Sequence, residues 1–103
     1  MSDTVIVTGV FELDPAKRDT AIAVFTDMME RTRVEEGCEH YAFSADLVDP
    51  GRFHLIEQWT SLATNEAHVQ TPHFPTFLEQ LGGLGITGVK LTQWLDATEK
   101  RVR

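Results

Sequence analysis

The sequence predicts one domain of the α+β class, in which helices cover one face of a four-stranded antiparallel sheet. The first observation is the order of segments, because patterns typical of strands and helices follow one another as strand, helix, strand, strand, helix, strand. The second is a turn signal, Asp49-Pro50-Gly51, between the two middle strands, which makes them antiparallel neighbours. The third is size, since 103 residues that are 42% hydrophobic and 24% charged suit a single globular domain.

The first strand and the first helix have clear boundary signals. Residues 5–13 are rich in Val, Ile and Phe, which favours a strand. Asp14 and Pro15 then provide a helix N-cap and a proline in the first turn. Gly37 is expected to end the helix, because glycine adopts a left-handed conformation without strain. The helical face expected to point inward consists of Ala21, Ile22, Phe25, Met28 and Met29.

A hairpin is expected after the first helix. Residues 38–48 alternate in polarity, and the residues expected on one face are Tyr41, Phe43, Ala45 and Leu47. Residues 53–59 read as the second strand of the hairpin.

The last part of the chain predicts a helical region and a final strand. Thr60 or Ser61 caps a helix over residues 62–70, and Thr71-Pro72 interrupts it. Apolar spacing over residues 74–81 adds a further amphipathic turn or two, and the glycine-rich residues 82–88 lead to a strand over 89–95.

Two helical regions against a four-stranded sheet predict a ferredoxin-like α+β sandwich. The helices can cover only one face of the sheet, yet the opposite strand register is also apolar, as at Ile6, Val10, Ile56 and Trp94. Because an uncovered apolar face promotes aggregation, we expect a second copy of the chain to pack there. The predicted assembly is a homodimer with two sheets facing one another.

Composition and charge exclude several classes of partner. Nine Lys and Arg against 16 Asp and Glu give a net charge of −7, which repels a polyanion such as DNA or RNA. The only basic cluster, over residues 100–103, is expected to be a solvated tail. No apolar stretch approaches the ~20 residues of a membrane span, no secretory signal is evident, and Cys38 is the only cysteine. We therefore expect a cytoplasmic protein that binds neither membranes nor nucleic acids.

Two patterns resemble functional motifs but lack the context that those motifs need. Residues 83–88 match G-x-G-x-x-G, but a helix precedes them and a strand follows, which is the reverse of a dinucleotide-binding fingerprint. His68 and His73 are five residues apart, which is not the i, i+4 spacing of two metal ligands on one helix. His40 and His54 are expected on neighbouring strands, where they can be cross-strand neighbours. Neither histidine pair has an acidic or cysteine ligand at a metal-like spacing. We therefore expect neither a cofactor nor a metal.

The candidate functional residues lie in the third predicted strand and in the helix that follows it. Strand alternation places Glu57 and Trp59 on one face, and Trp59 ends the strand where the next helix begins. Asn65 and His68 are three residues apart and so share one side of that helix. These groups can surround an apolar hollow, which is typical of a small-molecule site. The same residues also fit a closed core centred on Trp59, and residue types alone do not decide between the two.

A set of residues in the central part of the chain keeps the order and spacing of a known family. The set consists of Glu36-Gly37-Cys38, Tyr41, Asp49-Pro50, Phe53, Leu55, Glu57-Gln58-Trp59, His68 and Thr71-Pro72-His73-Phe74. It resembles the antibiotic biosynthesis monooxygenase domain family. The resemblance implies a single domain over residues 1–103 and a dimeric α+β barrel, which agrees with the homodimer expected from the two-faced sheet.

The resemblance also implies an oxygenase that uses no cofactor and oxidises an electron-rich phenol or quinol to a quinone with O2. A base removes the phenolic proton, the resulting anion reduces O2, and the peroxide collapses to the quinone. By this resemblance His68 does acid or base work, Trp59 is a pocket wall and hydrogen-bond donor, and Asn65 is an orienting group. The residues expected to contact the substrate are His73, Phe74, Glu57, Phe25 and Phe77.

Other functions stay open at this point. A related branch of the superfamily degrades haem and relies on an Asn in the first strand, which residues 5–13 lack, so haem is not expected. The same hollow would serve a non-catalytic dimer that binds aromatic ligands, or an isomerase of a small oxygenated metabolite. Fold and motif do not choose among these activities.

Overall fold

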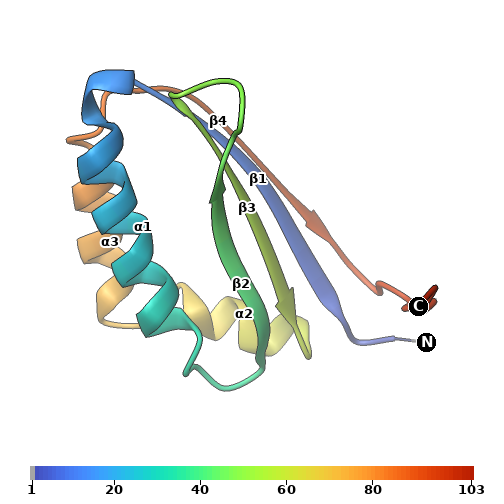
Figure 1. Ribbon diagram of the computed structural model, residues 1–103. Helices are drawn as coiled ribbons and strands as arrows, with labels where there is room; N and C mark the ends of the chain where they lie inside the picture. Colours follow the sequence, from blue (N-terminus) through green and yellow to red (C-terminus); the bar gives the residue numbers. More distant parts are fainter. Residues whose placement is uncertain (1) are drawn as a thin grey trace.

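The computed structural model describes residues 2–103 and has the predicted order of elements. The strands are β1 (Val5–Leu13), β2 (Cys38–Ala45), β3 (Arg52–Trp59) and β4 (Ile86–Trp94), and the helices are α1 (Arg18–Thr32), α2 (Leu62–His68) and α3 (His73–Leu81). The strands form one sheet in the order β2-β3-β1-β4, and every pair of neighbours is antiparallel. The helices lie on one face of this sheet (Figure 1), which confirms the ferredoxin-like α+β fold.

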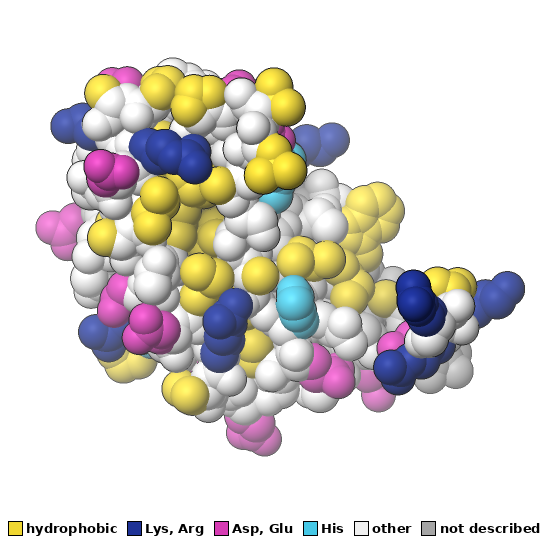
Figure 2. Space-filling view, in the orientation of Figure 1, with side chains coloured by type: hydrophobic (Ala, Val, Ile, Leu, Met, Phe, Trp, Pro, Cys, Tyr) yellow, Lys and Arg dark blue, Asp and Glu magenta, His cyan; other side chains and the backbone are white. Residues whose placement is uncertain are grey.

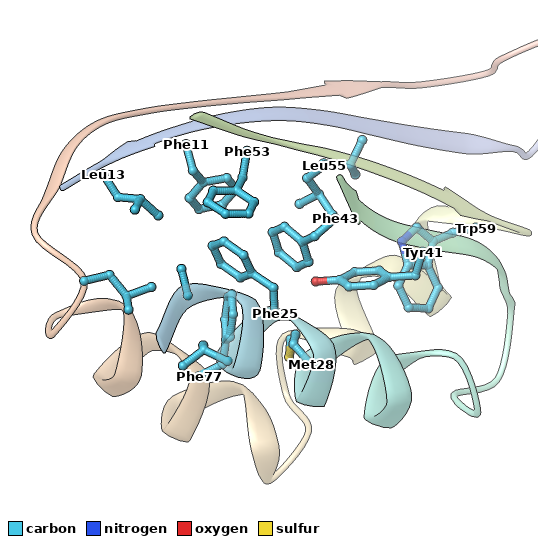
Figure 3. Close-up of a cluster of buried hydrophobic side chains, with 14 of the residues drawn as sticks. Phe11, Leu13, Phe25, Met28, Tyr41, Phe43, Phe53, Leu55, Trp59 and Phe77 are labelled. Atoms are coloured by element: carbon cyan, nitrogen blue, oxygen red, sulfur yellow. The ribbon is translucent and has the colours of Figure 1, made fainter. Parts of the chain in front are cut away.

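The core lies between the sheet and the helices. Burial along β1 alternates strictly, because every second residue from Val5 to Leu13 is buried. Four phenylalanines from β1, α1, β2 and β3 meet at its centre (Figure 3), and these are Phe11, Phe25, Phe43 and Phe53. Phe25 stacks on Phe43 with ring centroids 4.2 Å apart. Burying each such ring contributes roughly 2–3 kcal/mol to the free energy of unfolding.

The opposite face of the sheet carries the second set of apolar residues that the sequence predicts. Ile56 and Trp94 are 45% and 55% exposed, and none of the described helices covers them. Ile6 pairs with Trp94 across β1 and β4, so the apolar residues of this face are neighbours. At the end of the molecule where both termini lie, Lys and Arg side chains gather on the surface (Figure 2), and residues 100–103 are exposed there.

Several boundaries differ from the predictions. The first helix ends at Thr32, before Gly37, and Gly37 with φ +80° instead turns the chain into β2. On α1 the inner position expected for Ile22 belongs to Val24, because the buried residues follow an i, i+3, i+4 spacing from Ala21.

The ends of the other elements are shifted by a few residues. β2 ends at Ala45, because the Asp46 carboxylate accepts hydrogen bonds from the backbone N–H groups of Val48 and Asp49 in the turn that follows. Ala45 and Leu47 are therefore exposed and not on the inner face of a strand. α2 ends at His68 rather than at residue 70, and β4 begins at Ile86 rather than at residue 89. The start of β4 lies within the glycine-rich motif, which as expected leads into a strand and not into a helix.

Within residues 2–103, none of the helices is both long enough and apolar enough to cross a membrane.

Candidate active site

A cavity of about 390 Å³ lies between the inner face of the sheet and the helices α2 and α3. Most of its lining is apolar, contributed by Val7, Phe11, Leu55, Val69, Phe74, Phe77, Leu78, Leu81, Val89 and Leu91. The polar groups are few, namely Tyr41, Glu57, Asn65, His68, Thr92 and Gln93. Such a volume, with an apolar lining and a small number of polar groups, is typical of a site for a small molecule.

The helix α2 brings two of these polar groups into the cavity. Ser61 is the N-cap of the helix, and its hydroxyl accepts a hydrogen bond from the backbone N–H of Thr64. The Thr64 hydroxyl in turn accepts a hydrogen bond from the backbone N–H of Ser61, which completes a capping box. With the start of the helix fixed, Asn65 and His68 both point inward and are only 7% and 3% exposed. The Asn65 Oδ1 accepts a hydrogen bond of 2.7 Å from Gln93 Nε2, which joins α2 to β4.

Glu57 is an acid in an apolar wall. Trp59 Nε1 donates a hydrogen bond of 2.8 Å to Glu57 Oε1, as the shared strand face predicts. Burial raises the pKa of Glu57 from 4.5 to about 7, the Trp59 hydrogen bond opposes this rise, and the negative charge of Glu35 adds to it. Near neutral pH the carboxyl group is therefore a mixture of its protonated and ionised forms.

His68 forms a hydrogen-bonded triad with two residues that come from other segments. Its Nδ1 lies 3.0 Å from both Glu35 Oε1 and Glu35 Oε2, and His73 Nε2 lies 2.8 Å from Glu35 Oε2. Burial lowers the pKa of His68, while the hydrogen bond and the charge of Glu35 oppose this effect. The neutral imidazole is therefore the favoured form at neutral pH.

The loop between α1 and β2 places Glu35 in this triad. Gly37 adopts a left-handed conformation there, and a Cβ atom at this position would overlap the side chain of Thr64 on α2. The loop therefore packs directly against α2, and Glu35 reaches His68 at the end of that helix. Glu35 was not among the residues predicted from the sequence. The one local signal for it was Gly37, which follows the acidic pair Glu35-Glu36.

The triad is also the one group of three or more His, Cys, Asp and Glu side chains in residues 2–103 whose donor atoms lie within 4.8 Å of one another. The expectation that no acidic ligand accompanies His68 and His73 was therefore wrong, because Glu35 comes from a segment distant in the sequence. Its N···O distances of 2.8 and 3.0 Å are hydrogen-bond lengths. They are shorter than the roughly 3.4 Å between ligand atoms of a tetrahedral zinc site with bonds near 2.1 Å. His40 and His54 are not cross-strand neighbours, because they pair with Gln58 and Ser44.

Five of the predicted site residues line the cavity, and these are Glu57, Asn65, His68, Phe74 and Phe77. Three others lie outside its lining. Trp59 is fully buried behind Glu57, its ring centroid 5.0 Å from that of His68. Phe25 is part of the phenylalanine cluster, because its helix position directs it at Phe43 and not toward β4. His73 points to Glu35 instead of the mouth of the cavity.

The family of the chain follows from its sequence as well as from this geometry. The antibiotic biosynthesis monooxygenase family matches residues 4–80, and the chain therefore belongs to that family. A Synechocystis protein is 33% identical over 78 residues, which cover 76% of this chain and 53% of the relative. The chain thus spans about half the length of that relative. The Escherichia coli protein named probable quinol monooxygenase YgiN is 34% identical over 74 residues, which cover 64% of this chain and 71% of the relative.

Solved structures of similar proteins have the same fold over nearly the whole chain. A crystal structure from Deinococcus radiodurans has a TM-score of 0.89 at 25% identity and covers 96% of this chain and 98% of its own. The structure of Rv0793 from Mycobacterium tuberculosis has a TM-score of 0.84 at 28% identity and covers 95% of this chain and 99% of its own. The fold around the cavity is therefore the fold of this group of proteins.

Proposed function

We propose that the protein is a monooxygenase that oxidises an electron-rich phenol or quinol with O2 and without a cofactor. The observation that carries this proposal is the buried imidazole of His68, which lines an apolar cavity together with the buried carboxyl group of Glu57. Membership of the family supports a monooxygenase, and the name of the Escherichia coli relative supports a quinol as the class of substrate.

The chemistry begins with the removal of a proton in a cavity whose lining is mostly apolar. His68 accepts the phenolic proton, and the phenolate that results is electron-rich enough to reduce O2 directly. A C–O bond forms at a ring carbon that carries hydrogen, which gives a peroxide. That carbon then loses its proton as the O–O bond breaks, so the substrate becomes a quinone and the outer oxygen atom takes up two protons and leaves as water. The protonated form of Glu57 is suited to donate one of the protons that the leaving oxygen needs.

The remaining site residues bind and orient in this proposal. The Asn65 side chain, held by Gln93, presents its amide group to a substrate oxygen, and Phe74 and Phe77 contact the aromatic ring. Trp59 acts through Glu57, because its N–H group is already donated to that carboxyl oxygen. Phe25 and His73 do not contact the substrate.

We further propose that the functional form is a homodimer in which the open faces of two sheets meet. The exposed apolar residues Ile56 and Trp94 on that face support it. Sedimentation should give twice the mass of 11.6 kDa at micromolar concentration, and a stable monomer would contradict the proposal.

The decisive experiment measures oxygen uptake with a panel of quinols and polycyclic phenols in metal-free buffer. His68→Ala should lower kcat by about 100- to 10,000-fold, which is the usual contribution of a general base. Glu66→Ala is the control, because Glu66 is exposed on the helix that carries His68, and the variant should keep full activity. Uptake that is unchanged in His68→Ala removes this residue from the mechanism.

Two other outcomes would replace the proposed activity. Aromatic ligands that quench tryptophan fluorescence without any oxygen uptake would indicate a binding protein. Product formed under anaerobic conditions would indicate an isomerase.

A further inference from the structure

We infer that Glu35 is a positioning residue that fixes the His68 imidazole for proton abstraction, and that His73 holds Glu35 in place. This inference takes the reaction from the function proposed above, whereas the contacts among Glu35, His68 and His73 do not depend on that function. Glu35 thus has a role although it lies outside the cavity. His73 holds Glu35, whereas the sequence predicts that His73 contacts the substrate.

The contact between Glu35 and His68 is well suited to fix the imidazole ring. Both carboxylate oxygens of Glu35 lie 3.0 Å from Nδ1, so the N–H group points between two charged acceptors, and rotation of the ring would weaken this contact. The two side chains are shielded from water, with exposed fractions of 3% for His68 and 13% for Glu35. The hydrogen bond therefore competes little with solvent.

The carboxylate also determines which nitrogen carries the proton. An ionised carboxylate only accepts hydrogen bonds, so its partner Nδ1 must be protonated. The neutral imidazole then has its lone pair on Nε2, on the opposite edge of the ring. Because His68 lines the cavity, Nε2 is the atom that can take a proton from a bound phenol.

The charge of Glu35 matters once His68 has accepted that proton. A buried imidazolium without a partner is strongly disfavoured. The titratable groups that face His68 are Tyr41 from β2, Glu57 from β3, Glu35 from the loop before β2, and His73 from α3. Of these, Glu35 makes the direct hydrogen bond to the ring, so it is the group that stabilises the cation in this site.

His73 completes the arrangement from the solvent side. Its Nε2 lies 2.8 Å from Glu35 Oε2 and 3.3 Å from the hydroxyl of Thr71, which itself donates to the backbone oxygen of His68. The exposed fraction of His73 is 18%, and its ring lines a separate, polar groove of about 430 Å³ on the outside of α1 and α3. His73 thus orients the carboxylate and separates it from solvent.

A merely structural role for Glu35, as a link between the α1–β2 loop and α2, makes different predictions. Such a link would affect the free energy of unfolding, but it would not select a tautomer of His68 or influence the pH dependence of turnover. The test therefore measures properties that a structural link leaves unchanged.

The first measurement needs no substrate. We expect the 15N chemical shifts of His68 in the wild-type protein to show the Nδ1–H tautomer, and those of Glu35→Gln to show a mixture. The amide offers both a donor and an acceptor, so it no longer dictates the tautomer. A wild-type protein with the proton on Nε2 overturns the inference, even if no oxygenase activity is found. If wild-type His68 shows the Nδ1–H tautomer only after Zn²⁺ is added to the protein, the inference is overturned as well.

The second measurement is the pH dependence of kcat/KM with an active quinol. Activity needs neutral His68, so kcat/KM rises with pH through the pKa of His68. Because Glu35 raises that pKa, Glu35→Gln should move the rising part of the profile to lower pH and reduce kcat by about 10- to 1000-fold. Glu35→Asp should recover part of kcat, and His73→Phe should cost less than Glu35→Gln.

Glu36→Gln is the matched control, because Glu36 is the adjacent carboxyl group and is exposed. It should leave the tautomer, the pH profile and kcat unchanged. If Glu35→Gln behaves like this control, Glu35 has no positioning role. If Glu35→Gln does not fold, the Glu35→Asp variant and the wild-type tautomer still decide the question.

Discussion

The two ends of the layer between sheet and helices differ in what they contain (Figure 3). One end is the phenylalanine cluster of Phe11, Phe25, Phe43 and Phe53, which has aromatic neighbours only a few ångströms apart. At the other end Trp59 and Tyr41 pack against His68. The carboxyl groups of Glu57 and Glu35 form hydrogen bonds there, where the first end has only apolar rings. The cavity extends along this second end, and Phe11 is the one member of the phenylalanine cluster that also lines it. The difference teaches that the closely packed rings and the polar groups of the candidate site occupy largely separate parts of one small core.

The physical consequence is that the two ends contribute to stability with opposite signs. Close contacts between aromatic rings add about 0.5–1.5 kcal/mol per pair beyond the burial of their surface. A carboxyl group in an apolar wall instead costs free energy whenever it ionises, and this is what the raised pKa of Glu57 expresses. Removing a packed aromatic ring should therefore lower the free energy of unfolding, and removing the ionisable group of Glu57 should raise it.

The largest effect on stability is expected for Phe25→Ala. Phe25 is 2% exposed and contacts Phe11, Phe43 and Phe53, so its removal leaves a cavity in the packed end. The free energy of unfolding should fall by about 3–5 kcal/mol, measured by urea denaturation. Affinity for aromatic ligands should change little in the fraction that stays folded.

Phe74→Ala is the matched variant at the other end. Phe74 is half-buried, lines the cavity and contacts His68 edge-on at 5.4 Å between ring centroids. It should weaken the binding of aromatic ligands while reducing stability less than Phe25→Ala does. Equal effects of both variants on stability and binding would mean that the two ends are not separate.

The second prediction is that Glu57→Gln makes the protein more stable. The folded protein binds a proton at Glu57 more tightly than the unfolded chain, so the stability contributed by this group declines as pH rises from 4.5 to about 7. The whole shift corresponds to about 3 kcal/mol. Glutamine keeps an oxygen that accepts the Trp59 N–H group but cannot ionise, so the variant should unfold at higher urea concentration at pH 8.

This pH dependence can be separated from that of His68, which has the opposite sign. His68 has a lowered pKa, so its contribution is lost as pH falls below the ordinary value of 6.5. Glu57→Gln should therefore remove only the decline that accompanies a rise in pH from 4.5 to about 7. Glu66→Gln, an exposed carboxyl group on α2, is the control and should leave the urea midpoint unchanged across the pH range. A Glu57→Gln protein with the wild-type pH profile would contradict the raised pKa.

The sequence was sufficient to predict which residues share a face of one strand or helix, but not which of those faces meet a packed core and which meet a cavity. Period-two alternation correctly placed Tyr41 and Phe43 inside, and it put Glu57 and Trp59 on one face, where they form a hydrogen bond. Helical spacing likewise placed Asn65 and His68 together. These successes depend on neighbours within one element, where geometry follows directly from spacing.

The failures involve contacts between distant segments. Glu35 meets His68 because Gly37 lets a loop pack against Thr64, and no local periodicity encodes the conformation of a loop. Phe25 was expected to contact a substrate, but the inward face of a helix does not reveal whether it meets a cavity or a packed core. Helical spacing also placed Ile22 inside, because the apolar positions of α1 allow two overlapping faces.

The smallest predicted effect concerns Phe77, which contacts Phe25 of the phenylalanine cluster and, like Phe11, lines the cavity. Its ring lies 6.3 Å from that of Phe25 and 6.5 Å from that of Phe74, and it also lines the cavity. Phe77→Leu keeps a large apolar side chain, so the free energy of unfolding should fall by only about 1–1.5 kcal/mol. Ligand affinity should fall a few-fold in the same variant, because one aromatic contact with the bound ring is lost. Urea denaturation and fluorescence titration should therefore both respond at this position, in contrast to Phe25→Ala and Phe74→Ala. A variant that changes only one of the two would assign Phe77 to a single end and move the boundary between the stabilising region and the active site.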